Sequence, residues 1–312
     1  MNRPKLRLFS RLAVKAAVLC AAFAQIAISV PAQAGMANQA NAASADRPSY
    51  SATWIWDTSS RLKNADGAIQ YFRDNGFNLV FMQIDPDVPK ESYKTFNKKA
   101  AASGIEVHAL GGAPDWILRE KQIKVYQLID WVKIYNQSAA AEEQFKGIHL
   151  DVEPYVMKAW HADTDTMLGL WRDTVSGFVE EMKLETPQLV AGADLPVWLE
   201  MFDVPDGQGE RTTLSNWMIR KLDQTTLMAY RDNVPDIISS ITTELKEAER
   251  NGKPVIVAVE TLPSEDLSIS YFHKTKAQLT SDLGEVEKQL GGSASYAGYA
   301  IHDADGWTGL KE

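Results

Sequence analysis

The stretch GIHLDVEP at residues 147–154 alternates polar and apolar side chains, as a β-strand does. In a strand, His149, Asp151 and Glu153 share one face, and the aliphatic residues between them share the other. In a barrel of parallel strands the apolar face would meet an outer layer of helices. The polar face would then point into the barrel and rise toward the rim at the carboxyl ends of the strands.

Seven further runs rich in β-branched and apolar residues precede and follow this stretch. They lie at 52–57, 77–84, 105–110, 188–194, 225–230, 254–260 and 296–302. Segments with helical spacing separate them, which is typical of parallel βαβ units. Eight such units predict an α/β fold, a single (β/α)8 TIM barrel over residues 49–312. An open doubly wound sheet is the alternative, although no glycine-rich dinucleotide loop follows the first run.

The connecting segments differ at the two ends of the predicted strands. Three apolar stripes mark helices, and they consist of Val125, Leu128, Ile129 and Val132; Trp171, Val175, Phe178, Val179 and Met182; and Ile237, Ile241, Leu245 and Ala248. Glycines that stop helices stand just before several strands, at Gly76, Gly104, Gly147 and Gly252. Longer loops follow the strands, at 154–164, 195–212 and 261–273. Barrel enzymes build their sites from the loops on that side.

The first 34 residues have the pattern of a secretory signal peptide. Five basic residues and no acidic ones precede an apolar run at 16–30, and Ala32 and Ala34 end the segment. The apolar run is shorter than a membrane-spanning helix requires. We therefore expect cleavage near Ala34, a flexible leader at 35–48, no stable membrane insertion afterwards, and a secreted or periplasmic protein.

The composition limits the classes of partner and cofactor. The 312 residues carry a net charge of -9, and loss of the five basic signal residues would bring it to -14. An acidic protein is a poor ligand for nucleic acid. The sequence contains no serine-hydrolase elbow or P-loop, and its five histidines form no H-x-H or H-E-x-x-H pair. We expect no cofactor and no metal, although His108, His149 and His302 could converge inside a barrel.

Asp151 and Glu153 are the strongest candidates for chemistry. Two carboxyls on one strand face repel each other's charge, which raises the pKa of one of them. A protonated glutamate beside an ionised aspartate suits a general acid that cleaves a glycosidic bond. The alternative is a structural ion pair with a basic neighbour.

Three short motifs resemble glycoside hydrolase family 18, the chitinase-like barrels. They are Leu110-Gly111-Gly112, Asp151-Val152-Glu153 and Met228-Ala229-Tyr230, at the ends of strands three, four and six. The resemblance implies that Glu153 protonates the leaving oxygen, while Asp151 and Tyr230 hold a substrate acetamido group that acts as nucleophile. The family's strand-four motif has aspartates where this chain has Lys146 and His149.

Two other positions also depart from family 18. Arg231 stands where an Asp usually follows the tyrosine, and His302 stands where strand eight usually has Trp. These departures leave open a catalytically silent barrel that binds glycans or another protein.

A second resemblance concerns Glu153 and Glu260. In a large clan of barrel glycosidases, glutamates ending strands four and seven serve as acid/base and nucleophile, about 5–5.5 Å apart. Glu153 and Glu260 end those strands here, although the Asn that usually precedes the acid is absent. The alternative for Glu260 is a rim residue bound to a loop amide or to Arg231.

Aromatic and polar residues near the strand ends are candidates for binding a carbohydrate substrate. Indole faces can stack on sugar rings, and we select Trp56, Trp116, Trp198 and Trp307 for that role. The polar candidates are Asp57, Gln83, His108, His149, Asp194 and His302. We select these polar residues because all of them are expected at the same rim of the barrel, where a site could form.

Overall fold

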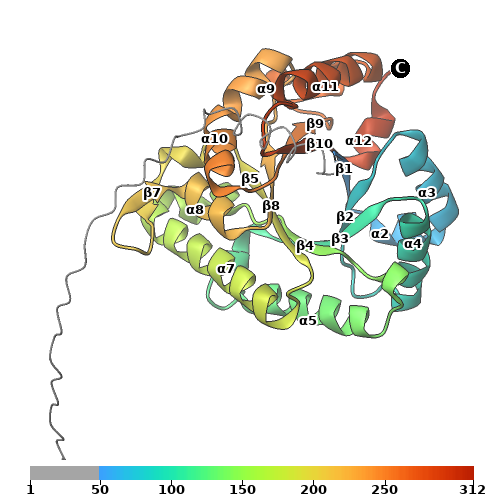
Figure 1. The fold of residues 1–312 in the computed structure, drawn as a ribbon, viewed down its shortest axis with the longest axis horizontal. Helices are drawn as coiled ribbons and strands as arrows, with labels where there is room; N and C mark the ends of the chain where they lie inside the picture. The colour runs from blue at the N-terminus through green and yellow to red at the C-terminus, as the bar shows by residue number, and fades with distance from the viewer. Residues whose placement is uncertain (1–48) are drawn as a thin grey trace, which may run out of the picture.

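The computed structural model describes residues 49–312, which form a closed barrel of parallel strands (Figure 1). The strands of the barrel are β1 (Tyr50–Ile55), β2 (Leu79–Gln83), β3 (Glu106–Gly111), β4 (Gly147–Leu150), β5 (Val190–Pro196), β8 (Gln224–Met228), β9 (Val255–Glu260) and β10 (Tyr296–His302). β1 pairs with both β2 and β10, so the sheet has no edges. The predicted barrel is confirmed, and the open sheet is excluded. The predicted signal peptide and leader lie outside the described residues.

Helices surround the barrel in Figure 1. They are α2 (Thr58–Lys63), α3 (Ala65–Asp74), α4 (Lys90–Ala102), α5 (Ile123–Gln137), α6 (Lys158–Ala162), α7 (Thr164–Glu185), α8 (Leu214–Lys221), α9 (Val234–Ser240), α10 (Thr242–Asn251), α11 (Lys276–Leu290) and α12 (Ala304–Gly309). Side chains cap many of their N-termini; Asp163, for example, accepts from the Thr166 amide at the start of α7. Gly252 ends α10 with φ of 64°, in the left-handed region that glycine adopts without strain.

The predicted apolar stripes pack against the barrel. Those of α5 and α7 are buried, as the spacing indicates. The third stripe is divided between two helices, because α9 ends at Ser240 and α10 begins at Thr242. Ile241 lies buried at this junction, so it fits the stripe without belonging to either helix.

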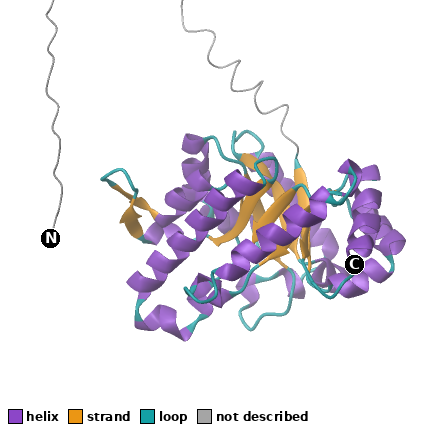
Figure 2. Cartoon of the chain, turned by 90° about the horizontal axis from the view of Figure 1, so that it is seen from below, coloured by secondary structure: helices purple, strands orange, loops and turns teal. Residues whose placement is uncertain are grey.

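The loops after the strands carry small elements of their own. The loop after β4 contains the 3-10 helix Pro154–Val156 and α6. The loop after β5 contains the 3-10 helix Leu199–Met201 and an antiparallel hairpin, β6 (Asp203–Pro205) with β7 (Arg211–Thr213). This hairpin projects from the body of the molecule in Figure 2. The sequence shows the length of this loop but not its hairpin, whose strands are only three residues long.

Two buried imidazoles fill the barrel interior, and glycines make room for them. His108 lies beside Gly147 on the next strand, and His149 lies beside Gly192. A Cβ at Gly147 would come within 2.7 Å of the His108 ring, and one at Gly192 within 2.6 Å of His149 Nδ1. Phe81 stacks on His149 with ring centroids 4.0 Å apart. Gly147 is therefore a strand residue that admits a neighbour's ring, not the helix stop that we expected.

Within residues 49–312, no helix combines the length and the apolar character needed to cross a membrane.

Candidate active site

A cavity of about 150 Å³ opens among the carboxyl ends of the barrel strands. Four carboxylic acids, two tryptophans, a tyrosine, a methionine and a histidine line it. They are Asp151, Glu153, Asp194, Glu260, Trp54, Trp56, Tyr230, Met228 and His302. No lysine or arginine is among them. The cavity joins groups from six strands or strand ends, which only barrel closure brings together.

Asp194 is a buried acid held by two aromatic side chains. It ends up 3% exposed and accepts a hydrogen bond of 3.2 Å from Trp54 Nε1. His149 Nε2 lies 2.9 Å from its other oxygen, at ion-pair distance but off the line of a hydrogen bond. These contacts fix the Asp194 carboxyl in place. His149, with no exposed surface, supports the cavity through Asp194 and does not line it.

Asp151 is held in a less favourable environment. Its Oδ1 is buried and has no hydrogen-bond partner within the described residues. Burial, the charge of Asp194 and the charge of Glu153 raise the pKa of Asp151 to about 8. The peptide of Asp151 packs against Gly112, where a Cβ would lie only 1.8 Å from the Asp151 carbonyl oxygen. The second glycine of the Leu110-Gly111-Gly112 motif is thus required for this close approach.

Glu153 follows the end of β4 and carries one side-chain hydrogen bond. The Tyr155 hydroxyl donates to Glu153 Oε1. Burial raises the pKa of Glu153, and the Tyr155 hydrogen bond offsets part of that rise. Burial also raises the pKa of Tyr155, so this phenol remains protonated and continues to donate. Glu153 is therefore an acid that holds its proton more strongly than an exposed glutamate, with one oxygen oriented.

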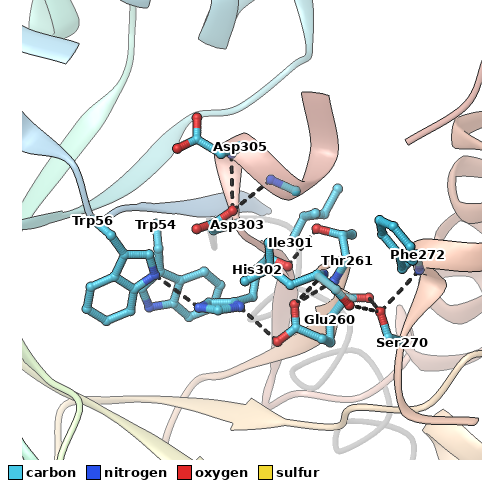
Figure 3. A network of polar contacts seen from close by, with 12 residues as sticks. Trp54, Trp56, Glu260, Thr261, Ser270, Phe272, Ile301, His302, Asp303 and Asp305 are labelled. Carbon is cyan, nitrogen blue, oxygen red and sulfur yellow. Dashed lines mark hydrogen bonds and ion pairs between the residues drawn. The ribbon is translucent and has the colours of Figure 1, made fainter. Parts of the chain in front are cut away.

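Glu260 is hydrogen-bonded through both of its oxygens (Figure 3). Its Oε1 accepts from the amides of Thr261 and Leu262, each at 2.7 Å, and its Oε2 lies 2.9 Å from His302 Nδ1. The other nitrogen of His302, Nε2, accepts from Trp56 Nε1 at 3.0 Å. The chain of contacts runs from the backbone after β9 to the wall of the cavity.

Tyr230 follows β8 and faces the same space. Its ring centroid lies 6.0 Å from that of His302. Burial and the surrounding carboxylates raise the pKa of Tyr230 well above the usual value of 10.0. Its hydroxyl stays protonated, which makes it available as a hydrogen-bond donor.

Three of the polar candidates lie away from the cavity. His108 is fully buried deeper in the barrel, 2.7 Å from Glu106 Oε1, and burial lowers its pKa. Asp57 is exposed and caps α2, where it accepts from the Ser60 amide. Gln83 ends β2 but does not line the cavity. A position at or near a strand end therefore does not by itself show whether a polar side chain lines the cavity, caps a helix or is buried deeper in the barrel.

The aromatic candidates divide in the same way. Trp56 lines the cavity, and Trp198 packs edge-on against Tyr155 at 4.9 Å. Trp116 is half-buried and packs against the helix layer beside Gly111. Trp307 is placed wrongly by our prediction: it is 8% exposed, donates to Asn75 at 2.6 Å and lines a separate cavity. Its position follows from α12, which turns it back against the helix layer.

Three residues of the site were not selected from the sequence. Trp54 lies two residues before Trp56 and so shares its inward face, a signal that strand alternation contains. Tyr155 lies two residues after Glu153 in the sequence. The 3-10 helix Pro154–Val156 after β4 is what brings the Tyr155 hydroxyl to the Glu153 carboxyl. Met228 is an apolar wall, and nothing in its type marks it as part of a site.

Among residues 49–312, no group of three or more histidine, cysteine, aspartate or glutamate side chains has an arrangement that could hold a metal ion.

No protein-family model matches the chain, and no curated protein matches its sequence. Solved structures with a similar fold include a chitinase from Bacteroides thetaiotaomicron, with TM-score 0.55, 10% identity, and coverage of 83% of this chain and 90% of that chain. A family 18 chitinase from Cycas revoluta in complex with (GlcNAc)3 gives TM-score 0.50 and 10% identity, covering 82% and 95%.

A third similar structure is a putative alpha-L-fucosidase from Bacteroides thetaiotaomicron, with TM-score 0.51 and 13% identity, covering 83% and 86%. At these identities the three likenesses establish a shared fold. The chain has the TIM barrel on which these glycoside hydrolases are built.

Proposed function

We propose that this protein is an exported glycoside hydrolase that cleaves a polysaccharide, with Glu153 as the general acid. The observation that carries the proposal is the pair of raised carboxyl pKa values at Asp151 and Glu153 within a closed-barrel cavity. A general acid must retain its proton near neutral pH and stand beside groups that stabilise positive charge at the sugar. The other carboxyl groups of the cavity can supply negative charge that stabilises this positive charge, and the similar folds of known glycosidases agree with the proposal.

The proposed reaction begins when Glu153 donates its proton to the glycosidic oxygen as the bond to the anomeric carbon breaks. An acetamido oxygen of the substrate attacks that carbon, and water later opens the resulting ring. Asp151 accepts from the acetamido N–H through its free Oδ1, and Tyr230 donates to the acetamido oxygen. The unpartnered Oδ1 supports this assignment, because a buried carboxyl oxygen without a donor is costly until a ligand supplies one.

The alternative mechanism makes Glu260 the nucleophile. A nucleophilic carboxylate needs an oxygen free to approach the anomeric carbon. Both Glu260 oxygens already have partners, in two backbone amides and His302. This arrangement favours the role of a rim residue bound to loop amides, and we assign the nucleophile to the substrate instead.

The test is hydrolysis of N-acetylated and non-acetylated polysaccharides, followed by the release of reducing ends. Glu153→Gln should lower the rate at least ~100-fold, the usual contribution of general acid catalysis. Glu180→Gln, an exposed position on α7, is the matched control and should retain full activity. Full activity in Glu153→Gln would refute the assignment of the acid.

The competing function is a silent barrel that binds glycans. His149 at a position where family 18 has an aspartate favours it. Binding on a glycan array with no reducing ends released over days would decide for that function.

Export is proposed from residues 1–34 alone. The N-terminal sequence of protein recovered from the medium or periplasm should begin at Gly35 or shortly after it. Recovery of the uncleaved chain in the cytoplasm would contradict export.

A further inference from the structure

The side chain of Trp56 is held in the cavity wall by a chain of hydrogen bonds. Its Nε1 donates to His302 Nε2 at 3.0 Å, and His302 Nδ1 lies 2.9 Å from Glu260 Oε2. Glu260 in turn accepts from two backbone amides after β9. Figure 3 shows this series running from the loop backbone through the imidazole to the indole. Trp56 is thus connected to the backbone after β9 through the side chains of His302 and Glu260.

The donor and acceptor roles in this series allow only one form of the imidazole. An indole N–H can donate but cannot accept. His302 Nε2 must therefore present its lone pair, and the single ring proton must reside on Nδ1, where it is donated to Glu260. The contact with Trp56 requires a neutral His302 in this tautomer.

Protonation of His302 would place an N–H opposite the indole N–H. Two donors cannot satisfy each other, so the contact is lost when the imidazole becomes charged. Trp56 is partly buried, and its ring contacts His302 edge-on with centroids 5.9 Å apart, so the imidazole both packs against the indole and accepts its N–H.

We propose that Glu260 and His302 are positioning residues that hold the Trp56 indole as a sugar-binding wall, and that they release it when His302 takes up a proton. The proposal rests on the glycosidase function proposed above, because the wall serves that reaction's substrate. It assigns Glu260 a function that neither catalytic scheme contains: it fixes the tautomer of His302.

The groups around His302 determine where it titrates. The charged and titratable groups that face it come from its own strand, from β9 and from the strand ends across the cavity: Glu260, Asp303, Asp194, Asp151, Glu153 and Tyr230. Burial lowers the pKa of His302, but the Glu260 hydrogen bond and the charges of Glu260, Asp303 and Asp194 together outweigh burial, and the net pKa is raised above 6.5. Release of Trp56 would therefore begin at a higher pH than the ordinary imidazole pKa of 6.5 predicts.

The decisive experiment follows the indole N–H signals of the secreted protein by NMR between pH 5 and 9, with no substrate present. Trp56→Phe identifies the Trp56 signal. Trp307, whose indole donates to Asn75 away from this cavity, is the internal comparison. We expect the Trp56 signal to shift in a single titration with its midpoint above 6.5. In Glu260→Gln the midpoint should fall by about 1 unit or more, because the opposite charge is removed.

A second measurement needs no variant. Nitrogen chemical shifts of the His302 ring at high pH should show the proton on Nδ1. A proton on Nε2, a Trp56 signal that stays constant, or an unchanged midpoint in a folded Glu260→Gln would each overturn the proposal. None of these readouts requires turnover, so failure of the proposed hydrolase activity is distinguishable from failure of this inference.

Discussion

Asp151→Asn should abolish activity and at the same time stabilise the protein in alkaline solution. The unfolded chain protonates this aspartate with a pKa near 3.8, whereas the folded protein does so near 8. The raised pKa means that the Asp151 contribution to stability is fully present below pH 3.8 and is lost as the pH rises through 8. Asparagine has a similar shape and no charge, so it avoids the loss.

The magnitude follows from the shift of the Asp151 pKa. A rise from 3.8 to about 8, at about 1.36 kcal/mol per unit, sets an upper bound of ~6 kcal/mol on the loss at high pH. Rearrangement of protons among the neighbouring carboxyls reduces it, and we expect at least ~2 kcal/mol to remain. For a domain of this size that corresponds to roughly 4 °C or more in Tm.

The assay is thermal unfolding of wild type and Asp151→Asn, measured by circular dichroism at pH 5 and pH 9. The gain of the variant should be small at pH 5 and large at pH 9. Asp130→Asn is the control, because Asp130 lies exposed on α5 and forms only a surface ion pair of 3.7 Å with Lys133. An Asp151→Asn protein that is no more stable than wild type at pH 9 would refute the reasoning on burial and charge.

Three further substitutions are informative: two test the same cavity, and the third tests a buried carboxyl remote from it. Gly112→Ala should lower activity and Tm together, because its Cβ would collide with the Asp151 backbone. The hydrolysis rate and a thermal melting curve of the variant test this expectation. Tyr155→Phe should raise the pKa of Glu153 by removing a hydrogen bond that lowers it, so that Glu153 titrates at higher pH in carbon NMR of its carboxyl. Burial raises the pKa of Glu244, on α10, to about 8, so Glu244→Gln should raise Tm at pH 9 more than at pH 5.

Sequence pattern predicted the barrel because its signal is repeated in every unit. Alternation puts Trp54 and Trp56 on one face of β1 and marks the polar face of β4, and the same pattern recurs in the other strands. The β6–β7 hairpin has no such support, since it occurs once and rests on three-residue strands. The sequence also does not reveal the break between α9 and α10 at Ile241. Ile241 is buried and apolar, so it fits the spacing of one continuous helical stripe.

The site was predictable only as far as strand ends determine it. The alternation of side chains in β4 predicts that His149 points into the barrel, but not how far below the cavity it lies. Its contact with Asp194 arises because β5 pairs with β4, which the alternation in β4 does not reveal. Trp307 lies just beyond a strand end, yet α12 directs it to Asn75. Contacts between segments far apart in the chain decide such cases, and one sequence does not contain them.

The two titrating parts of the cavity together limit the pH range in which it can work. Trp56 is held only above the pKa of His302, whereas Glu153 keeps its catalytic proton only below its own raised pKa. We therefore expect kcat/KM to follow a bell-shaped pH profile between these two limits. Glu260→Gln should move the acid limb to lower pH, because it removes the charge that favours protonated His302. An acid limb that does not move in this variant would show that His302 does not govern it, and the limb would then belong to the carboxyl pair.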